Sequence, residues 1–310
     1  MKSAYLFAAI TIFLWGSTAS VSKRMLSGLN SMQVLFCVSG LAALSLLVFN
    51  LIRGRGSFPA AKSLAPRDWP RLIGLGLIGI FGYNLLQYMA IDRLPAQEAL
   101  IINYLWPIMT VLFACVFLRE RMTPRKALAL VLSFAGVAIV TTRGDLLHVQ
   151  FQSLSGVLFA LISAILYGLF SVLQKRTGYD PTFSTMIYYA VAFVCSGVYL
   201  LLRQDFLPLA NLQPLQAAGL AWMGVFTSAT AYTCWATALE RGNTARISNL
   251  AFITPFLSLI YIYLLLHEEI SPYSVAGLLV IVLGILVQMG GSKKAERDPE
   301  SLQPERQRAR

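Results

Sequence analysis

Charged residues and histidines are scarce in this chain. Only 13% of its 310 residues are charged, and it has 2 histidines, His148 and His267. None of the 14 acidic residues falls in the middle of an apolar run, and no HExxH motif is present. Metal sites and acid–base catalysis need such side chains in clusters, so we expect no metal, no cofactor and no enzyme activity. A membrane-embedded hydrolase that depends on His267 is the alternative from a different class.

Cysteines are few, and the basic residues are dispersed. The 4 cysteines, Cys37, Cys115, Cys195 and Cys234, all lie inside apolar runs, and no CxxC pair occurs. Neither disulfides nor a structural zinc site are expected. The formal net charge is +11, but the basic residues border apolar runs and form no stripe interleaved with exposed aromatics. Nucleic acid is therefore not an expected partner.

Apolar residues are the abundant class. Hydrophobic residues make up 57% of the chain, and the mean hydropathy is +0.66, which is more apolar surface than one soluble core can bury. The sequence therefore predicts an all-α integral membrane protein embedded in a lipid bilayer. Its apolar runs predict ten transmembrane helices, near residues 5–22, 32–52, 71–91, 98–118, 124–142, 155–174, 183–202, 215–239, 246–266 and 272–290.

The distribution of basic residues predicts the orientation in the membrane. With alternating spans, fourteen Lys and Arg residues flank one membrane face and five flank the other, before six more in the tail are counted. Basic loops stay in the cytoplasm, so both termini are predicted to be cytoplasmic, in a multi-pass protein of a bacterial inner membrane. Residues 291–310 are highly charged and are predicted to form a disordered cytoplasmic tail.

One stretch of the chain occurs twice. Residues 94–124 read LPAQEALIINYLWPIMTVLFACVFLRERMTP, and residues 242–272 repeat their plan 148 residues later. At this offset Pro107 falls on Pro255, and Glu120 falls on Glu268. Since each half has five predicted spans, the second half enters the membrane upside down, as in many secondary transporters. We therefore expect two inverted five-helix repeats, residues 1–145 and 146–290, around a central cavity.

The repeated stretch carries a proline and a carboxylate in each half. Pro107 and Pro255 each lack an N–H and predict helix kinks, which are tolerated where the freed carbonyl faces a cavity or a neighbouring helix. A kink that serves packing alone is the competing interpretation. Glu120 and Glu268 precede the helix starts Thr123-Pro124 and Ser271-Pro272. Carboxylates are favoured near such starts, so both are interpreted as structural.

Several aromatic and amide side chains lie deep within the predicted spans. Interfacial belts place Trp and Tyr near span ends, as for Tyr88 and Tyr273, whereas the deep ones predict a pocket with apolar walls and a few polar tips. Packing in the core or against lipid is the competing interpretation. The candidate binding residues are Trp15, Tyr83, Asn84, Asn103, Tyr104, Trp106, Tyr167, Tyr232, Trp235 and Asn249.

These motifs resemble the drug/metabolite transporter superfamily, EamA type. The resemblance rests on the paired ends LRERMTP and LLHEEISP, on NYLWP and FITP, and on Trp15-Gly16 and Tyr167-Gly168. It implies ten-helix alternating-access carriers with a central cavity. The segment ALIINYLWPIMTVLF with Tyr83 is most similar to the bacterial aromatic amino-acid exporters. Export of aromatic and other neutral amino acids is therefore expected, with drugs or other metabolites as the alternative substrates.

Energy coupling is predicted from the position of the acids. Proton-linked carriers usually place an Asp, Glu or His within the membrane, whereas here the acids lie at span ends. We therefore expect gradient-driven, facilitated movement, with Glu98 as the residue that could make it proton-linked. The sequence leaves the oligomeric state open, and a monomer is compatible with it.

Overall fold

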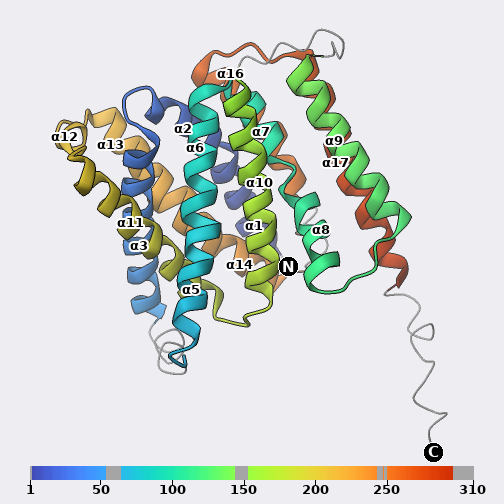
Figure 1. The fold of residues 1–310 in the computed structure, drawn as a ribbon, viewed down its shortest axis with the longest axis horizontal. Coiled ribbons are helices and arrows are strands. Elements are labelled where there is room, and N and C mark those ends of the chain that lie inside the picture. The colour runs from blue at the N-terminus through green and yellow to red at the C-terminus, as the bar shows by residue number, and fades with distance from the viewer. Residues whose placement is uncertain (1, 54–63, 144–152, 243–246, 248–249, 296–310) are drawn as a thin grey trace, which may run out of the picture.

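The computed structural model describes residues 2–53, 64–143, 153–242, 247 and 250–295, and within these ranges every regular element is a helix. In chain order the elements are α1 (Lys2–Gly16), α2 (Thr18–Leu26), α3 (Ser31–Arg53), α5 (Asp68–Gly76), η1 (Leu77–Gly82), α6 (Tyr83–Arg93), α7 (Ala96–Asn103), α8 (Trp106–Phe117), α9 (Pro124–Thr142), α10 (Leu154–Lys175), α11 (Pro181–Arg203), α12 (Leu207–Ala210), α13 (Pro214–Ala221), η2 (Trp222–Thr230), α14 (Ala231–Arg241), η3 (Ala251–Ile253), α16 (Thr254–Leu266) and α17 (Pro272–Ala295) (Figure 1).

Many of these helices are long and apolar enough to cross a bilayer. In the described part of the chain seven helical stretches meet that criterion, and two shorter apolar helices cover Ala251–Leu266 and Pro272–Val287. The predicted span at 215–239 is helical from α13 through η2 to α14. The all-helical membrane fold is thus confirmed, whereas the count of ten spans stays a prediction.

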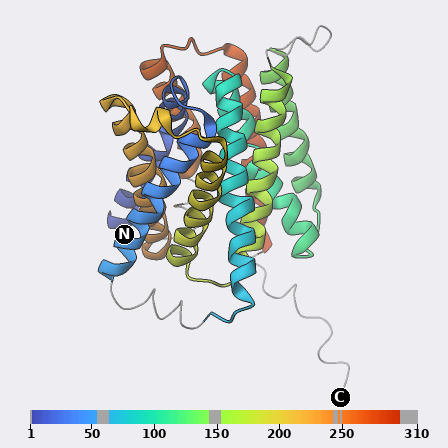
Figure 2. The ribbon, with the colours of Figure 1, turned by 60° about the vertical axis from the view of Figure 1, so that its left-hand side comes forward.

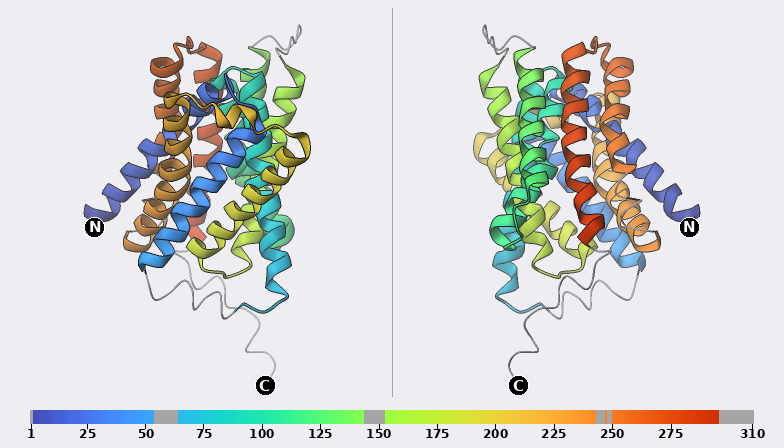
Figure 3. Two further views of the ribbon diagram at one scale, coloured as in Figure 1. Left: turned by 90° about the vertical axis from the view of Figure 1, so that its left-hand side faces the viewer. Right: turned by 90° about the vertical axis from the view of Figure 1, so that its right-hand side faces the viewer.

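The helices form one bundle and run alongside one another (Figure 2). The start of α1 and the end of α17 lie toward the same end of this bundle (Figure 3). Helices α9 and α17 pack side by side at its edge (Figure 1). Their backbones approach closely, because a Cβ on Gly136 would lie 2.6 Å from the carbonyl oxygen of Gly277. Small residues at helix crossings are typical of membrane bundles.

Helix α7 lies at the centre of the bundle. All of its residues, from Ala96 to Asn103, are buried, and Ile101 and Ile102 are fully inaccessible. The end groups of a helix that is buried on every side must be bonded by its neighbours, because no water reaches them. Its ends are therefore where polar contacts between helices are expected.

Several membrane-spanning stretches are interrupted or widened near their middle. The fourth is broken at Tyr104 and Leu105, and Pro107 lies in the first turn of the resumed helix α8. Pro255 has the same place in α16. Pro107 thus follows a break and Pro255 follows the 3₁₀ turn η3, so neither proline lies within a continuous α-helix that simply bends. The first stretch is interrupted at Ser17, and two stretches contain π-helical turns, η1 and η2.

Candidate functional site

A cavity of about 480 Å³ lies among the interrupted helices. This volume is in the range of small-molecule binding pockets. Its walls combine aromatic rings with hydroxyl and amide side chains. The lining residues are Trp15, Thr18, Ala19, Ser22, Asn84, Gln87, Tyr88, Ile91, Leu100, Asn103, Tyr104, Trp106, Pro107, Tyr167, Tyr232, Trp235, Ala251, Phe252 and Thr254.

The aromatic lining is organised in two groups. In one, the Trp15 ring of α1 contacts Tyr232 and Trp235 of α14, with ring centroids 5.2 and 5.5 Å apart. In the other, the Tyr167 ring of α10 contacts Trp106 of α8 at 5.1 Å and Tyr83 of α6 at 4.7 Å. Rings at these separations support one another, so the cavity has preformed walls drawn from both halves of the chain.

Polar side chains of three helices meet behind the Tyr167 group. Ser163 of α10 lies 2.9 Å from the side-chain oxygen of Gln87, and Asn103 donates from Nδ2 to the Tyr83 hydroxyl at 3.2 Å. The Asn84 amide donates to the carbonyl of Ile80 at 2.8 Å. Amides buried in a membrane protein need such partners. These contacts hold the amides in place at the cavity wall.

Thr254 is the one lining residue with a buried, unsatisfied hydroxyl among the residues that the structure describes. It is 6% exposed and begins α16. A buried hydroxyl without a partner costs free energy unless a ligand or water satisfies it. The backbone N–H of Thr254 already donates to the carbonyl of Ala251, and Pro255 has no N–H, so the hydroxyl is the donor available at this helix start. Thr254 therefore marks a position where an anionic group of a ligand can be bound.

Most of the binding residues predicted from the sequence line the cavity. Those that line the cavity are Trp15, Asn84, Asn103, Tyr104, Trp106, Tyr167, Tyr232 and Trp235, together with Pro107. Tyr83 lies behind the wall and supports Asn103 and Tyr167. Pro255 is buried next to Thr254, and Asn249 is outside the described residues.

Some lining residues were not recognised in the sequence. Tyr88, assigned there to an interfacial belt, is 4% exposed and lines the cavity instead. Position along a span misled that assignment, because α6 continues to Arg93, beyond the predicted end of the span. Thr254 was also missed. Its signal was available, since it stands 148 residues after Trp106 and directly before the second proline.

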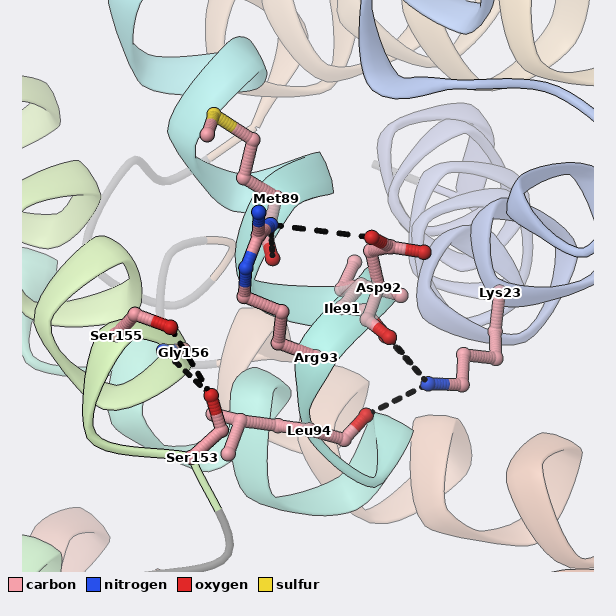
Figure 4. Close-up of polar contacts among 9 residues, drawn as sticks. All are labelled: Lys23, Met89, Ile91, Asp92, Arg93, Leu94, Ser153, Ser155 and Gly156. Atoms are coloured by element: carbon pink, nitrogen blue, oxygen red, sulfur yellow. Dashed lines mark hydrogen bonds and ion pairs between the residues drawn. The ribbon is translucent and has the colours of Figure 1, made fainter.

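One end of the bundle is held together by polar contacts between helices. Lys23 of α2 donates to the carbonyl oxygens of Ile91 and Leu94, at 2.5 and 2.7 Å (Figure 4). These carbonyls lie at the end of α6, where backbone oxygens lack helical partners. Ser22 and Ile91, which adjoin this contact, line the cavity. Lys23 therefore fixes α2 to α6 directly beside the cavity.

Glu268 extends the same set of contacts to α7. Its carboxylate accepts from the Ala96 N–H at 3.1 Å, and the Gln97 side chain bonds to the backbone of Glu269 and Ser271. A carboxylate at the start of a buried helix accepts from an N–H that has no partner within the helix, and its negative charge is stabilised by the positive end of the helix dipole. The structural interpretation of Glu268 agrees with this position.

The other acidic residues near the membrane have local partners. Glu120 pairs with Lys126 at 2.9 Å. Glu98 is 8% exposed and pairs with Arg143 at 3.3 Å. None of the described residues that line the cavity is charged.

Potential metal ligands are dispersed in the part of the chain that the structure describes, and His267, on which the hydrolase alternative depends, does not line the cavity. Within these ranges no three His, Cys, Asp or Glu side chains are grouped for a metal ion. His267 is exposed and adopts a φ of 55° at the end of α16, away from the cavity lining. The cavity therefore has the composition of a binding site for a neutral or zwitterionic molecule.

The known proteins to which this chain is similar in sequence are named as transporters or exporters. The sequence pattern of the EamA-like transporter family matches residues 2–142 and again residues 154–289. An uncharacterized transporter of Bacillus subtilis, YvbV, is 28% identical over 293 residues, covering 93% of this chain and 92% of that protein. The aromatic amino acid exporter YddG of Ancylobacter novellus is 24% identical over 266 residues, covering 83% and 86%. One crystal structure superposes with a TM-score of 0.64 at 20% identity, over 96% of this chain and 99% of that one, and so shares the fold.

Proposed function

Since the chain belongs to the EamA-like transporter family and is a multi-pass membrane transporter, we propose that it exports aromatic and other neutral amino acids. The observation that carries this proposal is the composition of the cavity. Rings of Trp15, Trp106 and Tyr167 provide an apolar wall, and no described lining residue is charged. An aromatic side chain fits such a wall, because it buries a large apolar surface at little entropic cost.

The polar ends of an amino acid need partners in the same cavity. The free Thr254 hydroxyl at the start of α16, where the helix dipole is positive, provides a donor for a carboxylate. The amide oxygens of Asn84 and Asn103 and the end of α7 provide acceptors for an ammonium group. Interrupted helices are used in this way by other secondary transporters. A zwitterion can therefore be held without a charged side chain.

The proposal includes alternating access between two inverted five-helix repeats, residues 1–145 and 146–290. The two separate matches to one family pattern support this division. It also includes a bacterial inner-membrane location with cytoplasmic termini, supported by the position of α1 and α17 toward one end of the bundle and by the basic loops of that end. Movement follows the substrate gradient. Glu98, the acid considered for proton coupling, is paired with Arg143 and does not line the cavity.

The test is transport by purified protein in liposomes. Saturable flux of labelled phenylalanine and tryptophan is expected, with weaker flux of threonine, because only the aromatic substrates contact the ring walls fully. Protein-free liposomes are the control for leakage. If no amino acid shows saturable flux, the substrate assignment is wrong. Saturable flux of an apolar drug alone would assign the cavity to the alternative substrates.

The same liposomes test the energy coupling. Counterflow of labelled phenylalanine is expected without a pH difference or a membrane potential. Uphill accumulation that follows an imposed pH gradient and is lost in Glu98→Gln would show proton coupling and contradict the proposal. Hydrolysis of a reporter ester that is lost in His267→Ala would favour the enzyme alternative.

A further inference from the structure

A second cavity, of about 500 Å³, lies apart from the central one. Its walls come from the start of α5, from η1, and from the end of α10 with the turn that follows. It shares no lining residue with the central cavity. Both α5 and α10 belong to candidate membrane spans, Asp68–Arg93 and Leu154–Lys175. The second cavity therefore sits where these spans reach the membrane surface.

The polar end of this cavity is built around Asp68. Its carboxylate accepts from the Tyr179 hydroxyl at 3.0 Å and from the Ala65 N–H at 2.9 Å. Arg71 lies 3.8 Å from the same carboxylate. The hydroxyl and N–H contacts engage both carboxylate oxygens and fix the turn after α10 against the start of α5. The polar end is therefore a defined structure.

Positive charge exceeds negative charge at this end. The Arg71 side chain is 66% exposed and its ion pair with Asp68 is long. Arg176 is exposed, and its guanidinium has no hydrogen-bond or ion-pair partner within the described ranges. The cavity lining thus has two guanidinium groups and one carboxylate, and that carboxylate is already satisfied by other donors. An added anion would be favoured here, since Arg forks bind phosphate oxygens well.

The other end of the cavity is apolar and open. Its lining consists of Gly74, Leu75, Ile78 and Leu173. A Cβ built on Gly74 would meet no atom within 4 Å, so the missing side chain leaves free space along α5. This apolar part continues from the arginines toward the interior of the predicted spans. The cavity therefore has a cationic head and an apolar groove, in the order in which a phospholipid has its phosphate and its acyl chain.

We propose that this cavity binds an anionic phospholipid, with its phosphate at Arg71 and Arg176 and an acyl chain along Gly74 and Ile78. A lipid fits better than a soluble phosphate because the groove continues the cationic site along a membrane-spanning helix. The orientation predicted from the basic loops places this end in the cytoplasmic leaflet, where basic pockets between membrane helices bind anionic headgroups.

Native mass spectrometry of the full chain in detergent tests this site. Phosphatidylglycerol is expected to bind the wild type more tightly than phosphatidylcholine of the same chain length. The double variant Arg71→Gln, Arg176→Gln should weaken phosphatidylglycerol binding about thirtyfold, the loss expected for two basic residues at a membrane surface. The matched control is Arg121→Gln, Arg125→Gln, which removes two exposed charges, one from the turn before α9 and one from the first turn of α9. Equal loss in both double variants would overturn the site.

A third variant separates a lipid from a soluble anion. Gly74→Leu fills the open groove without a backbone clash. It should reduce binding of long-chain phosphatidylglycerol several-fold and leave binding of glycerol phosphate unchanged. If glycerol phosphate binds the wild type as tightly as the lipid does, or if Gly74→Leu has no effect on the lipid, the proposal is wrong. This variant also decides the question if the double arginine variant does not fold.

Discussion

The two proline-containing segments, residues 96–117 and 251–266, border the same cavity with different chemistry. At the offset of 148 residues, Asn103, Tyr104 and Trp106 correspond to Ala251, Phe252 and Thr254, and all six line the cavity. The first segment contributes an amide and an indole, and the second contributes small and apolar side chains with one hydroxyl. Matched backbone positions are thus retained while the side chains have diverged. A substrate with an apolar body and different polar ends fits such an asymmetric cavity.

The turns that follow these segments each carry a glutamate, and the two glutamates have different partners. Glu120 bonds to Lys126, six residues later in its own half. Its counterpart Glu268 caps Ala96 in the other half. In this conformation the turn of the second segment is tied across the bundle, whereas that of the first has a local partner.

The largest expected effect comes from removing the aromatic side of the first segment. Trp106→Ala should raise the KM for phenylalanine at least about tenfold, because burying an aromatic ring contributes roughly 1.5–3 kcal/mol. Initial flux in liposomes measures it. The control is Tyr273→Ala, since Tyr273 is 45% exposed and does not line the cavity. Similar losses in the two variants would mean that the cavity is not where the substrate binds.

The matched position of the second segment should give a smaller and more specific effect. Thr254→Val keeps the shape and removes the hydroxyl, so kcat/KM for phenylalanine should fall about threefold to tenfold, the value of one hydrogen bond. Without substrate, its thermal stability should equal or exceed that of the wild type, because the removed hydroxyl has no partner.

Ser39→Ala is the control for Thr254→Val, since Ser39 is also buried and unsatisfied but does not line the cavity. Its flux should match that of the wild type. Unchanged flux in Thr254→Val would remove the hydroxyl from the proposed carboxylate site. A loss of stability in Thr254→Val would indicate a structural role instead.

Glu120 and Glu268, which correspond to each other in the two halves, allow the two ends of the bundle to be compared. In a chain without its native cysteines, Ser22→Cys places a buried thiol beside Lys23. Glu268→Ala should speed its reaction with an impermeant reagent about fivefold in intact cells, because the cap on α7 is lost. Glu120→Ala should leave the rate unchanged. Faster labelling in Glu120→Ala would show that the two turns are equivalent in the membrane.

The smallest effect on transport is expected from two cysteine substitutions that test which end of the bundle faces which side of the membrane. Cysteines at exposed Ser27 and at Met122, which is 47% exposed, should leave the flux within about twofold of the wild type. In intact cells Ser27→Cys should react with the impermeant reagent, and Met122→Cys should react only after the membrane is permeabilised. The reverse pattern would invert the predicted orientation.

The sequence predicted those features that depend on hydropathy and on the repeat. Trp106 and Tyr104 were selected because they lie deep in a predicted span, and both line the cavity. Thr254 was not selected, although the repeat aligns it with Trp106, because one threonine in an apolar run has no distinctive pattern of its own. Tyr88 was misassigned because hydropathy gives depth along a helix and does not give the direction in which a side chain points.

The interruptions of the helices could be predicted only in part. Prolines mark the break before α8 and the 3₁₀ turn before α16, since they remove backbone donors. The π-helical turns η1 and η2 have no such marker. They depend on packing between helices, as where a Cβ on Gly79 would lie 2.1 Å from the Phe170 ring. Contacts of that kind join residues far apart in the sequence and cannot be derived from local composition.

A π-helical turn contains a surplus residue relative to an α-helix. Helix η1 directly precedes Tyr83 and Asn84, and Ala231 alone separates η2 from Tyr232. If the surplus residue were taken up into α-helical geometry, the helix that follows would rotate about its own axis by about 100°. A rotation of that size would change which side chains α6 or α14 presents to the cavity, without lengthening either connection. Selectivity in this protein can thus be retuned by inserting or deleting a single residue in η1 or η2, next to the lining residues on α6 and α14.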